Sequence, residues 1–289
     1  MPLFGRADGT IAKDIAPYRR IMPFIMKTRT ESAVYFEQEI DLTRTLQFIA
    51  QWNATHEQRI TVFHLFLWAS TRALHERPGM NRFTMGGNIY QRNGIWISYS
   101  AKKEMKDGSP LVILKRQFDP ALSFDQMVQF IYGDVKEGRS DKKLLQDKEI
   151  GMSLMLPSIV LRIGLWAIRW LDSVNLLPYS FTRPDPMYAS MFVANLGSVK
   201  LESAFHHLYE YGNIPIFAAI GRNKKMAVAG DDGQVTTKTI CSVKYSFDER
   251  VEDGLYCAKT LDLLRGYIED PAAHGASAGA LAPAAQPAA

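Results

Sequence analysis

Strand-like and helix-like stretches alternate along this chain, and neighbouring strand-like stretches follow one another across short glycine-containing turns. Residues 89–100 alternate in polarity around the turn Arg92–Gly94, and the strand-like runs 216–220 and 236–247 flank a second turn, Gly230–Gly233. Strands joined in this way pair antiparallel, because a short turn reverses the chain direction. The pattern therefore predicts helices packed on a mixed, mostly antiparallel sheet.

Further segments have apolar residues at helical spacing, with residues at their ends that suit a helix terminus. Asp41 precedes the first segment, and Pro78 and Gly79 end the second. The predicted helices are Leu42–Thr55, Thr61–Glu76, Ser123–Gly138 and Leu255–Ile268, and Leu201–Tyr211 is also helix-like. The remaining predicted strands are Ala33–Ile40, Leu111–Leu114 and Met191–Leu196.

Composition excludes several classes of protein. With 289 residues, 47% hydrophobic and 22% charged, the chain is neither a disordered protein nor a collagen or coiled coil. Two cysteines exclude a disulfide framework and suit a reducing, cytoplasmic environment, and a net charge of +4 does not predict nucleic-acid binding. Neither a secretory signal nor an uncharged apolar stretch of ~18 residues is present, so no membrane-spanning helix is expected.

The most informative segment is Tyr245–Gly254, which reads YSFDERVEDG and lies between a predicted strand and the last predicted helix. That helix ends in Glu269-Asp270-Pro271. The segment closely resembles the end of the catalytic domain of 2-oxoacid dehydrogenase dihydrolipoamide acyltransferases, whose pattern is S-F-D-H-R-x-x-D-G, a helix and then E-D-P. Chloramphenicol acetyltransferase shares this fold and the H-x-x-x-D-G spacing.

Other segments resemble the same family in the same order over roughly residues 16–271. They are Arg19–Met22 (family R-R-M), Glu39–Thr43 (E-V-D-M-T), Thr61–Ala69 (T-x-x-x-F-L-x-K-A), Arg77–Asn81 (x-P-x-L-N), Asn195–Gly197 (S-N-L-G) and Asn213–Gly221 (N-P-P-x-x-A-I-L-G). The resemblance implies a chloramphenicol-acetyltransferase-like two-layer α/β sandwich. It also implies a homotrimer, or an assembly of trimers as in a 2-oxoacid dehydrogenase complex, with coenzyme A as acyl carrier.

The expected domain organisation follows from the extent of the resemblance. Residues 1–15 form an N-terminal extension, and residues 16–271 form the acyltransferase-like domain with an insertion at about 148–189. Residues 272–289 are rich in Ala and Pro and are expected to be disordered, because such a tail buries too little apolar surface to offset its ordering entropy.

The resemblance also assigns the reaction. The family moves an acyl group between coenzyme A and the thiol of dihydrolipoamide, with a histidine as general base and a serine or threonine of the neighbouring subunit as oxyanion donor. In this chain the histidine position is Glu249 and the serine position is Ala194. Loss of one oxyanion donor costs roughly 100–1000-fold in rate. The favoured interpretation is therefore a catalytically degenerate subunit with a structural or binding role, in which the coenzyme A channel can persist.

Two other interpretations of this loop stay open. Glu249 can act as general base if burial raises its pKa, with Asn195 or a backbone amide as the new donor and an unknown, lipid-like acceptor. Alternatively, Glu249 forms a structural ion pair with Arg250 or a lysine. The resemblance gives Asp248, Arg250, Asp253 and Gly254 the role of holding the loop, and Asp253 is expected to pair with an arginine near the N-terminus, either Arg19 or Arg20.

The other chemically active residues give weaker signals. His206 and His207 supply a base only if their segment reaches the channel, and His64 is expected to be a satisfied core histidine. Cys257 is expected to be a small buried residue and not a nucleophile. The six histidines are scattered without the spacing of metal ligands, so no metal is predicted.

The insertion contains an unusually apolar segment, Met152–Pro178. Within it Trp166 and Trp170 accompany Arg162 and Arg169 on a predicted helix, the composition of an interfacial helix. Three alternatives follow: a helix buried in the domain or a trimer interface, a helix docked on a membrane or a hydrophobic partner, and a lid over a pocket for a long acyl chain. The docked form makes the protein a membrane-surface scaffold.

Overall fold

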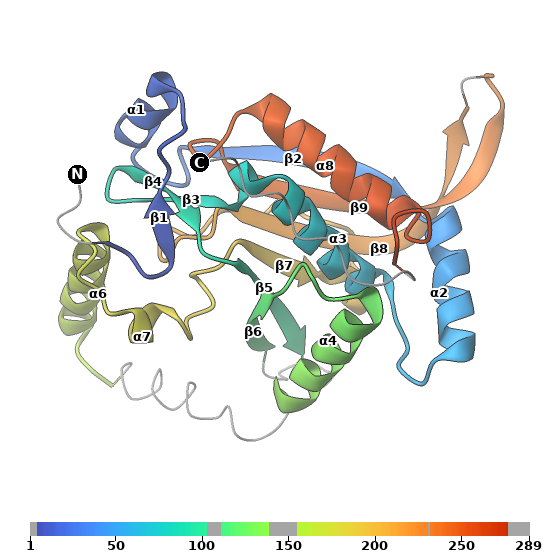
Figure 1. Ribbon diagram of the computed structural model, residues 1–289, viewed down its shortest axis with the longest axis horizontal. Coiled ribbons are helices and arrows are strands. Elements are labelled where there is room, and N and C mark those ends of the chain that lie inside the picture. Colours follow the sequence, from blue (N-terminus) through green and yellow to red (C-terminus); the bar gives the residue numbers. More distant parts are fainter. Residues whose placement is uncertain (1–4, 103–110, 139–154, 231, 277–289) are drawn as a thin grey trace.

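The computed structural model describes residues 5–102, 111–138, 155–230 and 232–276. Its centre is a six-stranded sheet covered on one face by helices (Figure 1). The strands follow the order β2 (Ala33–Asp41), β9 (Val235–Asp248), β8 (Ile216–Ala229), β7 (Met191–Asn195), β5 (Ile95–Lys102) and β6 (Leu111–Phe118). Neighbours are antiparallel except for β5–β7 and β7–β8, which confirms the expected mixed, mostly antiparallel sheet.

A smaller antiparallel sheet lies beside the large one. It consists of β1 (Gly9–Ile11), β4 (Asn88–Arg92) and β3 (Arg82–Met85). Residues 9–11 belong to the expected N-terminal extension, yet they pair with β4 and so form part of this sheet.

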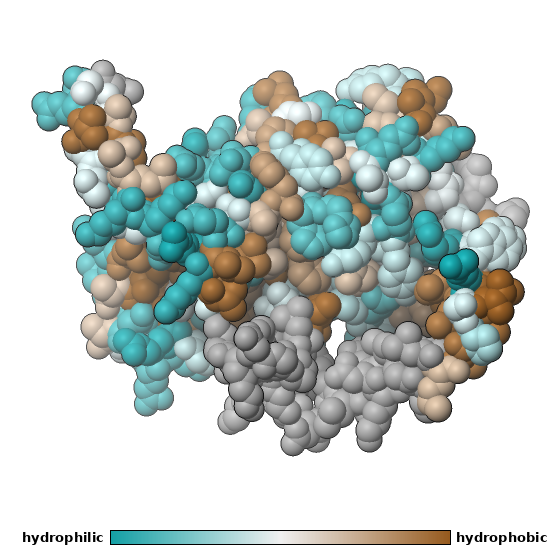
Figure 2. Space-filling view, turned by 180° about the vertical axis from the view of Figure 1, so that it is seen from behind, coloured by the Kyte–Doolittle hydropathy of each residue, from teal (hydrophilic) through white to brown (hydrophobic). Residues whose placement is uncertain are grey.

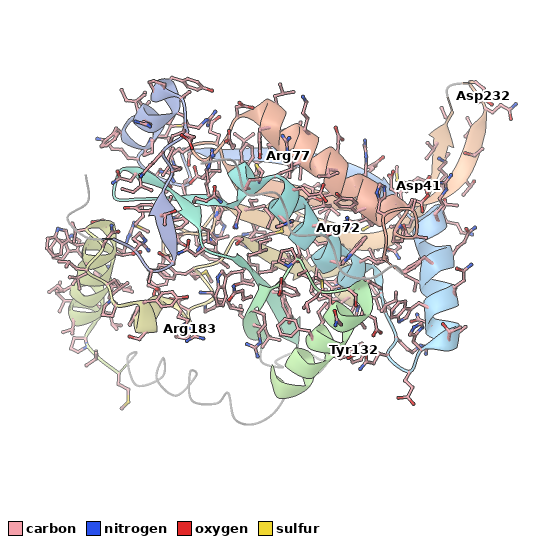
Figure 3. All side chains as sticks on the ribbon, viewed as in Figure 1. Asp41, Arg72, Arg77, Tyr132, Arg183 and Asp232 are labelled. Atoms are coloured by element: carbon pink, nitrogen blue, oxygen red, sulfur yellow. The ribbon has the colours of Figure 1, made fainter. Side chains whose placement is uncertain are left out.

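Four helices cover one face of the large sheet: α2 (Thr43–Thr55), α3 (Val62–Glu76), α4 (Phe124–Gly138) and α8 (Gly254–Glu269). Successive side chains of β9 point to opposite faces of the sheet, and those on the helix face form part of the core. They are Cys241, Val243, Tyr245 and Phe247, each at most 1% exposed. Arginines join the helices at their edges. Arg77 of the α3 C-terminus lies 3.8 Å from the ring centre of Tyr256 in α8 (Figure 3).

The opposite face of the large sheet also carries an apolar cluster, made by Ala189, Phe192, Leu208, Ile214, Phe217 and Ala219. The segment 201–211 lies on this face and contains no helix, so the predicted helix is wrong. Tertiary contacts fix its irregular backbone, since Leu208 enters the cluster and the Ser246 hydroxyl donates to the His206 carbonyl oxygen.

The turn at Arg92–Gly94 does not form the predicted hairpin. It joins β4 of the small sheet to β5 of the large sheet, and these two strands do not pair. The predicted hairpin at Gly230–Gly233 is confirmed, and β8 and β9 extend beyond their predicted limits into a projecting two-stranded arm (Figure 1).

The insertion contributes α6 (Ser158–Ser173) and the short helix α7 (Tyr179–Thr182), while residues 148–154 of it lie outside the described residues. Asp172 is the one buried residue of α6, so the helix does not lie inside the domain. Brown atoms at the right-hand edge of Figure 2 mark its apolar outer surface. Arg6 anchors it, because its Nη1 lies 2.7 Å from Asp172 Oδ1 and both side chains are at most 5% exposed.

One α-helix, two 3-10 turns and the C-terminal end complete the described part of the chain. Helix α1 (Pro17–Ile25) precedes β2, and the 3-10 turns η1 (Pro78–Asn81) and η3 (Leu196–Val199) follow α3 and β7. Residues 272–276, expected to be disordered, form a turn in which Ala276 is only 2% exposed. Residues 277–289 lie outside the described residues.

Candidate functional site

The loop between β9 and α8 is held by a buried ion pair. Asp248, the last residue of β9, is 1% exposed and accepts two hydrogen bonds from Arg250, one from Nε at 2.7 Å and one from Nη2 at 2.6 Å. The backbone N–H of Arg250 donates a third at 3.1 Å, and the Thr84 hydroxyl of β3 donates a fourth at 3.2 Å. Arg250 Nη1 in turn donates to the Met26 carbonyl oxygen at 3.0 Å. This two-pronged geometry is the strongest form of such a pair, and it ties the loop to β3 and to the end of α1.

The second half of the loop forms the start of α8. Asp253 caps the helix by accepting from the backbone N–H of Tyr256 at 2.8 Å, and Gly254 is the first helical residue. Of the two arginines expected near Asp253, Arg19 makes the contact, at 3.9 Å, and it lies 3.8 Å from Glu252. Arg20 instead donates to the Lys13 carbonyl oxygen.

Glu249 occupies the centre of this loop. Its N–H donates to the Ser32 carbonyl oxygen at 3.0 Å, and its own carbonyl oxygen accepts from Arg19 at 2.7 Å. Its half-buried side chain makes no recorded hydrogen bond or ion pair with any residue that the structure describes. The ion pair expected with Arg250 is wrong, because Asp248 binds that guanidinium. The backbone of residue 249 is therefore fixed from two sides, while its carboxylate is not.

Ala194 and Asn195 end strand β7. Ala194 pairs with Ala219 of β8 and presents only a methyl group to the apolar cluster on the outer face. Asn195 caps the following turn, with its Oδ1 accepting from the Ser198 N–H at 3.2 Å. Gly197 is required there, since a Cβ would lie 2.5 Å from the carbonyl oxygen of Gly221.

A single chain does not bring residues 194 and 249 together. The sheet register places Ala194 beside Ala219 and Lys244, whereas Glu249 follows the end of β9 at Asp248. At ~3.4 Å per strand residue, the part of β9 between Lys244 and Asp248 alone spans roughly 14 Å along the strand direction. Within one chain the two positions are therefore too far apart to contribute to the same site.

The other candidate residues are structural. The His206 ring stacks on Phe217 at 3.9 Å between ring centres, and burial lowers the pKa of His206. His64 accepts from the Thr61 N–H in the N-terminal cap of α3, and burial lowers its pKa to about 4. Cys257 is 1% exposed, and burial raises its pKa to about 12, which fits the expected small core residue.

Across residues 5–102, 111–138, 155–230 and 232–276, no group of three or more His, Cys, Asp or Glu side chains is arranged to hold a metal ion. In the same ranges, none of the helices has both the length and the apolar character needed to cross a bilayer.

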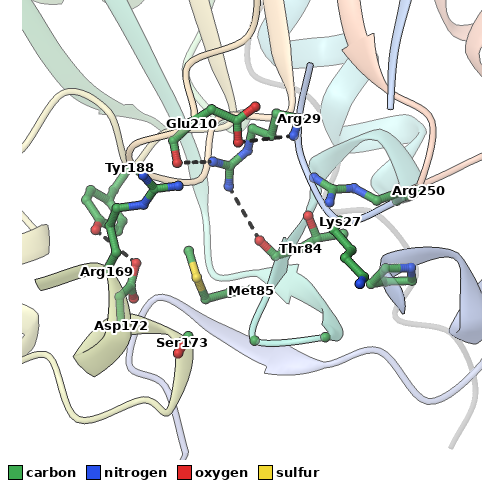
Figure 4. Close-up of a pocket in the computed structure, with 14 residues that line it drawn as sticks. Lys27, Arg29, Thr84, Met85, Arg169, Asp172, Ser173, Tyr188, Glu210 and Arg250 are labelled. Carbon is green, nitrogen blue, oxygen red and sulfur yellow. Dashed lines mark hydrogen bonds between the residues drawn. The ribbon is translucent and has the colours of Figure 1, made fainter. Parts of the chain in front are cut away.

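Sequence reasoning missed a polar pocket near the loop, drawn in Figure 4. It is bordered by the segment before β2, the β3–β4 turn and the C-terminal half of α6, and Arg250 is one of its walls. Its other charged residues are Lys27, Arg29, Arg169 and Glu210, together with Asp172. They come from segments far apart in the chain, and none belongs to a recognisable motif.

Comparisons with known proteins agree with this architecture. Residues 11–105 and 181–275 match the family model described as "2-oxoacid dehydrogenases acyltransferase (catalytic domain)". A comparison with curated protein sequences found no match. The match to the family model leaves out residues 106–180, which contain α4 and α6.

Solved structures with the same fold include a probable dihydrolipoamide acetyltransferase from Listeria monocytogenes 4b F2365, with a TM-score of 0.58 at 16% identity over 90% of this chain and 95% of that one. Dihydrolipoamide acetyltransferase from Azotobacter vinelandii has a TM-score of 0.54 at 16% identity, covering 91% and 93%. A chloramphenicol acetyltransferase has a TM-score of 0.54 at 12% identity, covering 91% and 98%. At these identities the likeness concerns the fold alone.

Proposed function

Because this chain belongs to the family of 2-oxoacid dehydrogenase acyltransferase catalytic domains, we propose that it is a family member that keeps the scaffold and has lost acyl-transfer chemistry. Its role is then that of a structural or binding subunit in a trimeric assembly of the 2-oxoacid dehydrogenase type. The coenzyme A channel that the resemblance implies needs a second copy of the chain, so we attribute no contact with coenzyme A to a single chain.

The pair of replacements at Glu249 and Ala194 carries this proposal. A general base needs a lone pair that is held toward the proton, and no hydrogen bond or ion pair from the described residues holds the Glu249 carboxylate in such an orientation. A methyl group at residue 194 cannot donate a hydrogen bond to an oxyanion. On this proposal both catalytic groups are replaced. Glu249 takes the place of the base in one subunit, and Ala194 takes the place of the oxyanion donor in the neighbouring subunit.

The intact scaffold of the loop supports a role that still needs the fold. The Asp248–Arg250 pair and the contacts of Arg19 hold residues 248–253 without any catalytic histidine. A buried pair of this kind costs desolvation energy, which its hydrogen bonds repay only when the geometry is good. A subunit that keeps its assembly surface and lacks its reaction would have this combination of features.

An acetyl-transfer assay tests the proposal. With acetyl-coenzyme A as donor and dihydrolipoamide as acceptor, we expect the rate with protein to equal the rate without it. Glu249→Gln should leave that rate unchanged, as should the matched control Asp262→Asn, an exposed carboxylate on α8. The measurement is the release of free coenzyme A thiol. Turnover that disappears in Glu249→Gln but survives in Asp262→Asn would instead establish Glu249 as an active general base.

The exposed face of α6 favours a second candidate function, docking on an anionic membrane surface. Trp166 is 66% exposed and Trp170 is 50% exposed, with Ile159, Ile163 and Leu165 also more than half exposed. Arg162 and Arg169 on the same helix are exposed and suit anionic lipid headgroups. The pocket bordered by α6 has a charged lining, which does not favour the alternative of a lid over a long acyl chain.

Vesicle flotation tests this second function. We expect the protein to float with phosphatidylserine-containing vesicles at low salt and less at high salt, because exposed charges are screened. Trp166→Ala combined with Trp170→Ala should lower the bound fraction about tenfold or more, since each large side chain contributes apolar burial. Leu255→Ala, which removes a residue that is 67% exposed on α8, should not change binding. Equal flotation of the double variant and the wild type would rule out α6 as the membrane contact.

A further inference from the structure

The pocket beside the loop is a cavity of about 230 Å³ (Figure 4). Its walls carry four basic side chains, Lys27, Arg29, Arg169 and Arg250, and two carboxylates, Asp172 and Glu210. Two of these six residues, Arg169 and Asp172, come from α6, so the insertion builds one wall of the cavity. All of the walls belong to one chain, and the cavity therefore does not depend on assembly.

Both carboxylates are already engaged by other groups. Asp172 accepts from Arg6 at 2.7 Å through Oδ1 and from the Tyr188 hydroxyl at 2.9 Å through Oδ2. Glu210 accepts from the Thr30 N–H and hydroxyl through Oε1, each at 2.9 Å, and from the backbone N–H of Arg29 through Oε2. Neither carboxylate lies within ion-pair distance of a guanidinium or ammonium group of the cavity wall among the described residues.

Arg29 is the unusual member of the wall. It is 5% exposed, yet its guanidinium donates only to carbonyl oxygens, those of Tyr209 at 3.1 Å, Glu210 at 3.3 Å and Thr84 at 3.5 Å. Its Nε has no hydrogen-bond partner, and no carboxylate of the described residues lies within 4.0 Å of the guanidinium. Burial lowers the pKa of Arg29, with Asp248 and Glu210 acting in the opposite direction. A buried cation without a counter-charge is costly unless an anion completes the site.

Two further cations of the wall are also uncompensated. Figure 4 shows Lys27 and Arg169 on opposite sides of the cavity. Both are exposed, and neither side chain has a recorded hydrogen bond or ion pair within the described part of the chain. Arg250, by contrast, is neutralised by Asp248 at 2.6 Å. The cavity therefore has three basic groups around it that lack a charged partner.

We propose that this cavity binds a phosphate-type oxyanion, which neutralises Arg29 and is held between Lys27 and Arg169. A tetrahedral dianion offers oxygens in several directions at once, whereas a monocarboxylate offers one edge. Guanidinium groups match phosphate through paired N–H donors, and an ammonium group adds a point charge. The cavity is larger than one such ion, which leaves room for a small attached group.

Titration calorimetry on the full chain tests the proposal, with inorganic phosphate as the probe and sodium chloride keeping the ionic strength constant. We expect saturable binding of one phosphate per chain. Lys27→Ala and Arg169→Ala should each weaken binding about tenfold or more, the usual loss for a hydrogen bond to a charged group, and the double variant should show none. Both side chains are exposed, so these variants should fold. Lys259→Ala, an exposed lysine on α8, should bind as the wild type does.

Two further probes define the ligand. If glycerol phosphate binds as tightly as inorganic phosphate, the ligand is the phosphate end of a larger molecule. If only inorganic phosphate binds, the ligand is the phosphate ion itself. Either result supports the proposal. Absence of saturable binding, unchanged affinity in the double variant, or equally tight binding of acetate would overturn it. None of these outcomes depends on acyl transfer, so they are independent of the proposed loss of that activity.

Discussion

Asp248→Ala is expected to lower the free energy of unfolding by about 3–5 kcal/mol, the cost of leaving one member of a buried ion pair without its partner. The two side chains are 5% and 1% exposed, and Arg250 has its Nε and Nη2 directed at this carboxylate. Thr84 would also lose its acceptor. Because the pair joins β9 to β3 and to the end of α1, the loss should extend to the loop 249–253.

Denaturant titration followed by circular dichroism measures this effect, at a fixed protein concentration because an oligomer's stability depends on it. Glu202→Ala is the matched control. It breaks the pair with Arg222, whose side chains are 53% and 47% exposed, and exposed pairs are worth about 1 kcal/mol or less. If Asp248→Ala proved as mild as Glu202→Ala, the ion pair would not be what holds the loop.

The combined change Glu249→His and Ala194→Ser is expected to raise acetyl transfer to dihydrolipoamide by at least about 100-fold over the wild type. A positioned general base contributes about 100- to 10,000-fold, and one oxyanion donor about 100- to 1000-fold. The backbone of residue 249 is already fixed by Ser32 and Arg19, so an imidazole there would start from an ordered main chain. In the trimeric assembly that we propose, the new serine of one copy is expected to lie beside the new histidine of the next.

The two single variants are the controls for this experiment. Residues that act as a unit are strongly non-additive, so each single change should give much less than the pair. The measurement is the initial rate of coenzyme A thiol release, with the oligomeric state checked for every variant. A correctly assembled double variant that stays at the background rate would contradict the proposal that these two residues alone account for a loss of acyl transfer.

Local turn chemistry predicted some connections of this fold and failed on others. The glycines at 230 and 233 identify the β8–β9 hairpin, because both strands continue beside each other on either side of the turn. The turn at 92–94 has an equally good local signal, yet β4 and β5 enter different sheets. A turn reverses the chain direction but does not determine which strands pair, because the partner of each strand can be a strand from a distant part of the sequence.

The segment 201–211 shows a second limit of local reasoning. Its composition suits a helix, but Leu208 is buried in the outer-face cluster and the backbone of His206 is bound by Ser246. These contacts come from strands before and after the segment, and tertiary packing overrides a weak helical preference. The helices α2, α3, α4 and α8 were predicted within one or two residues, because strong apolar periodicity and end signals agree in each of them.

The sequence by itself determined the residues of the loop that resembles the family, with a carboxylate at Glu249, and the methyl side chain of Ala194 before Asn195. That these two residues stand in place of the family's histidine and serine is what the resemblance implies, and it is the premise of the proposed function. The sequence also determined the apolar character of the inserted helix. Only the tertiary structure decided that Arg250 pairs with Asp248, that α6 keeps its apolar face exposed, and that Lys27, Arg29 and Arg169 surround one cavity. Ion pairing, side-chain burial and cavity formation depend on contacts between segments far apart in the sequence. A local sequence pattern does not specify those contacts.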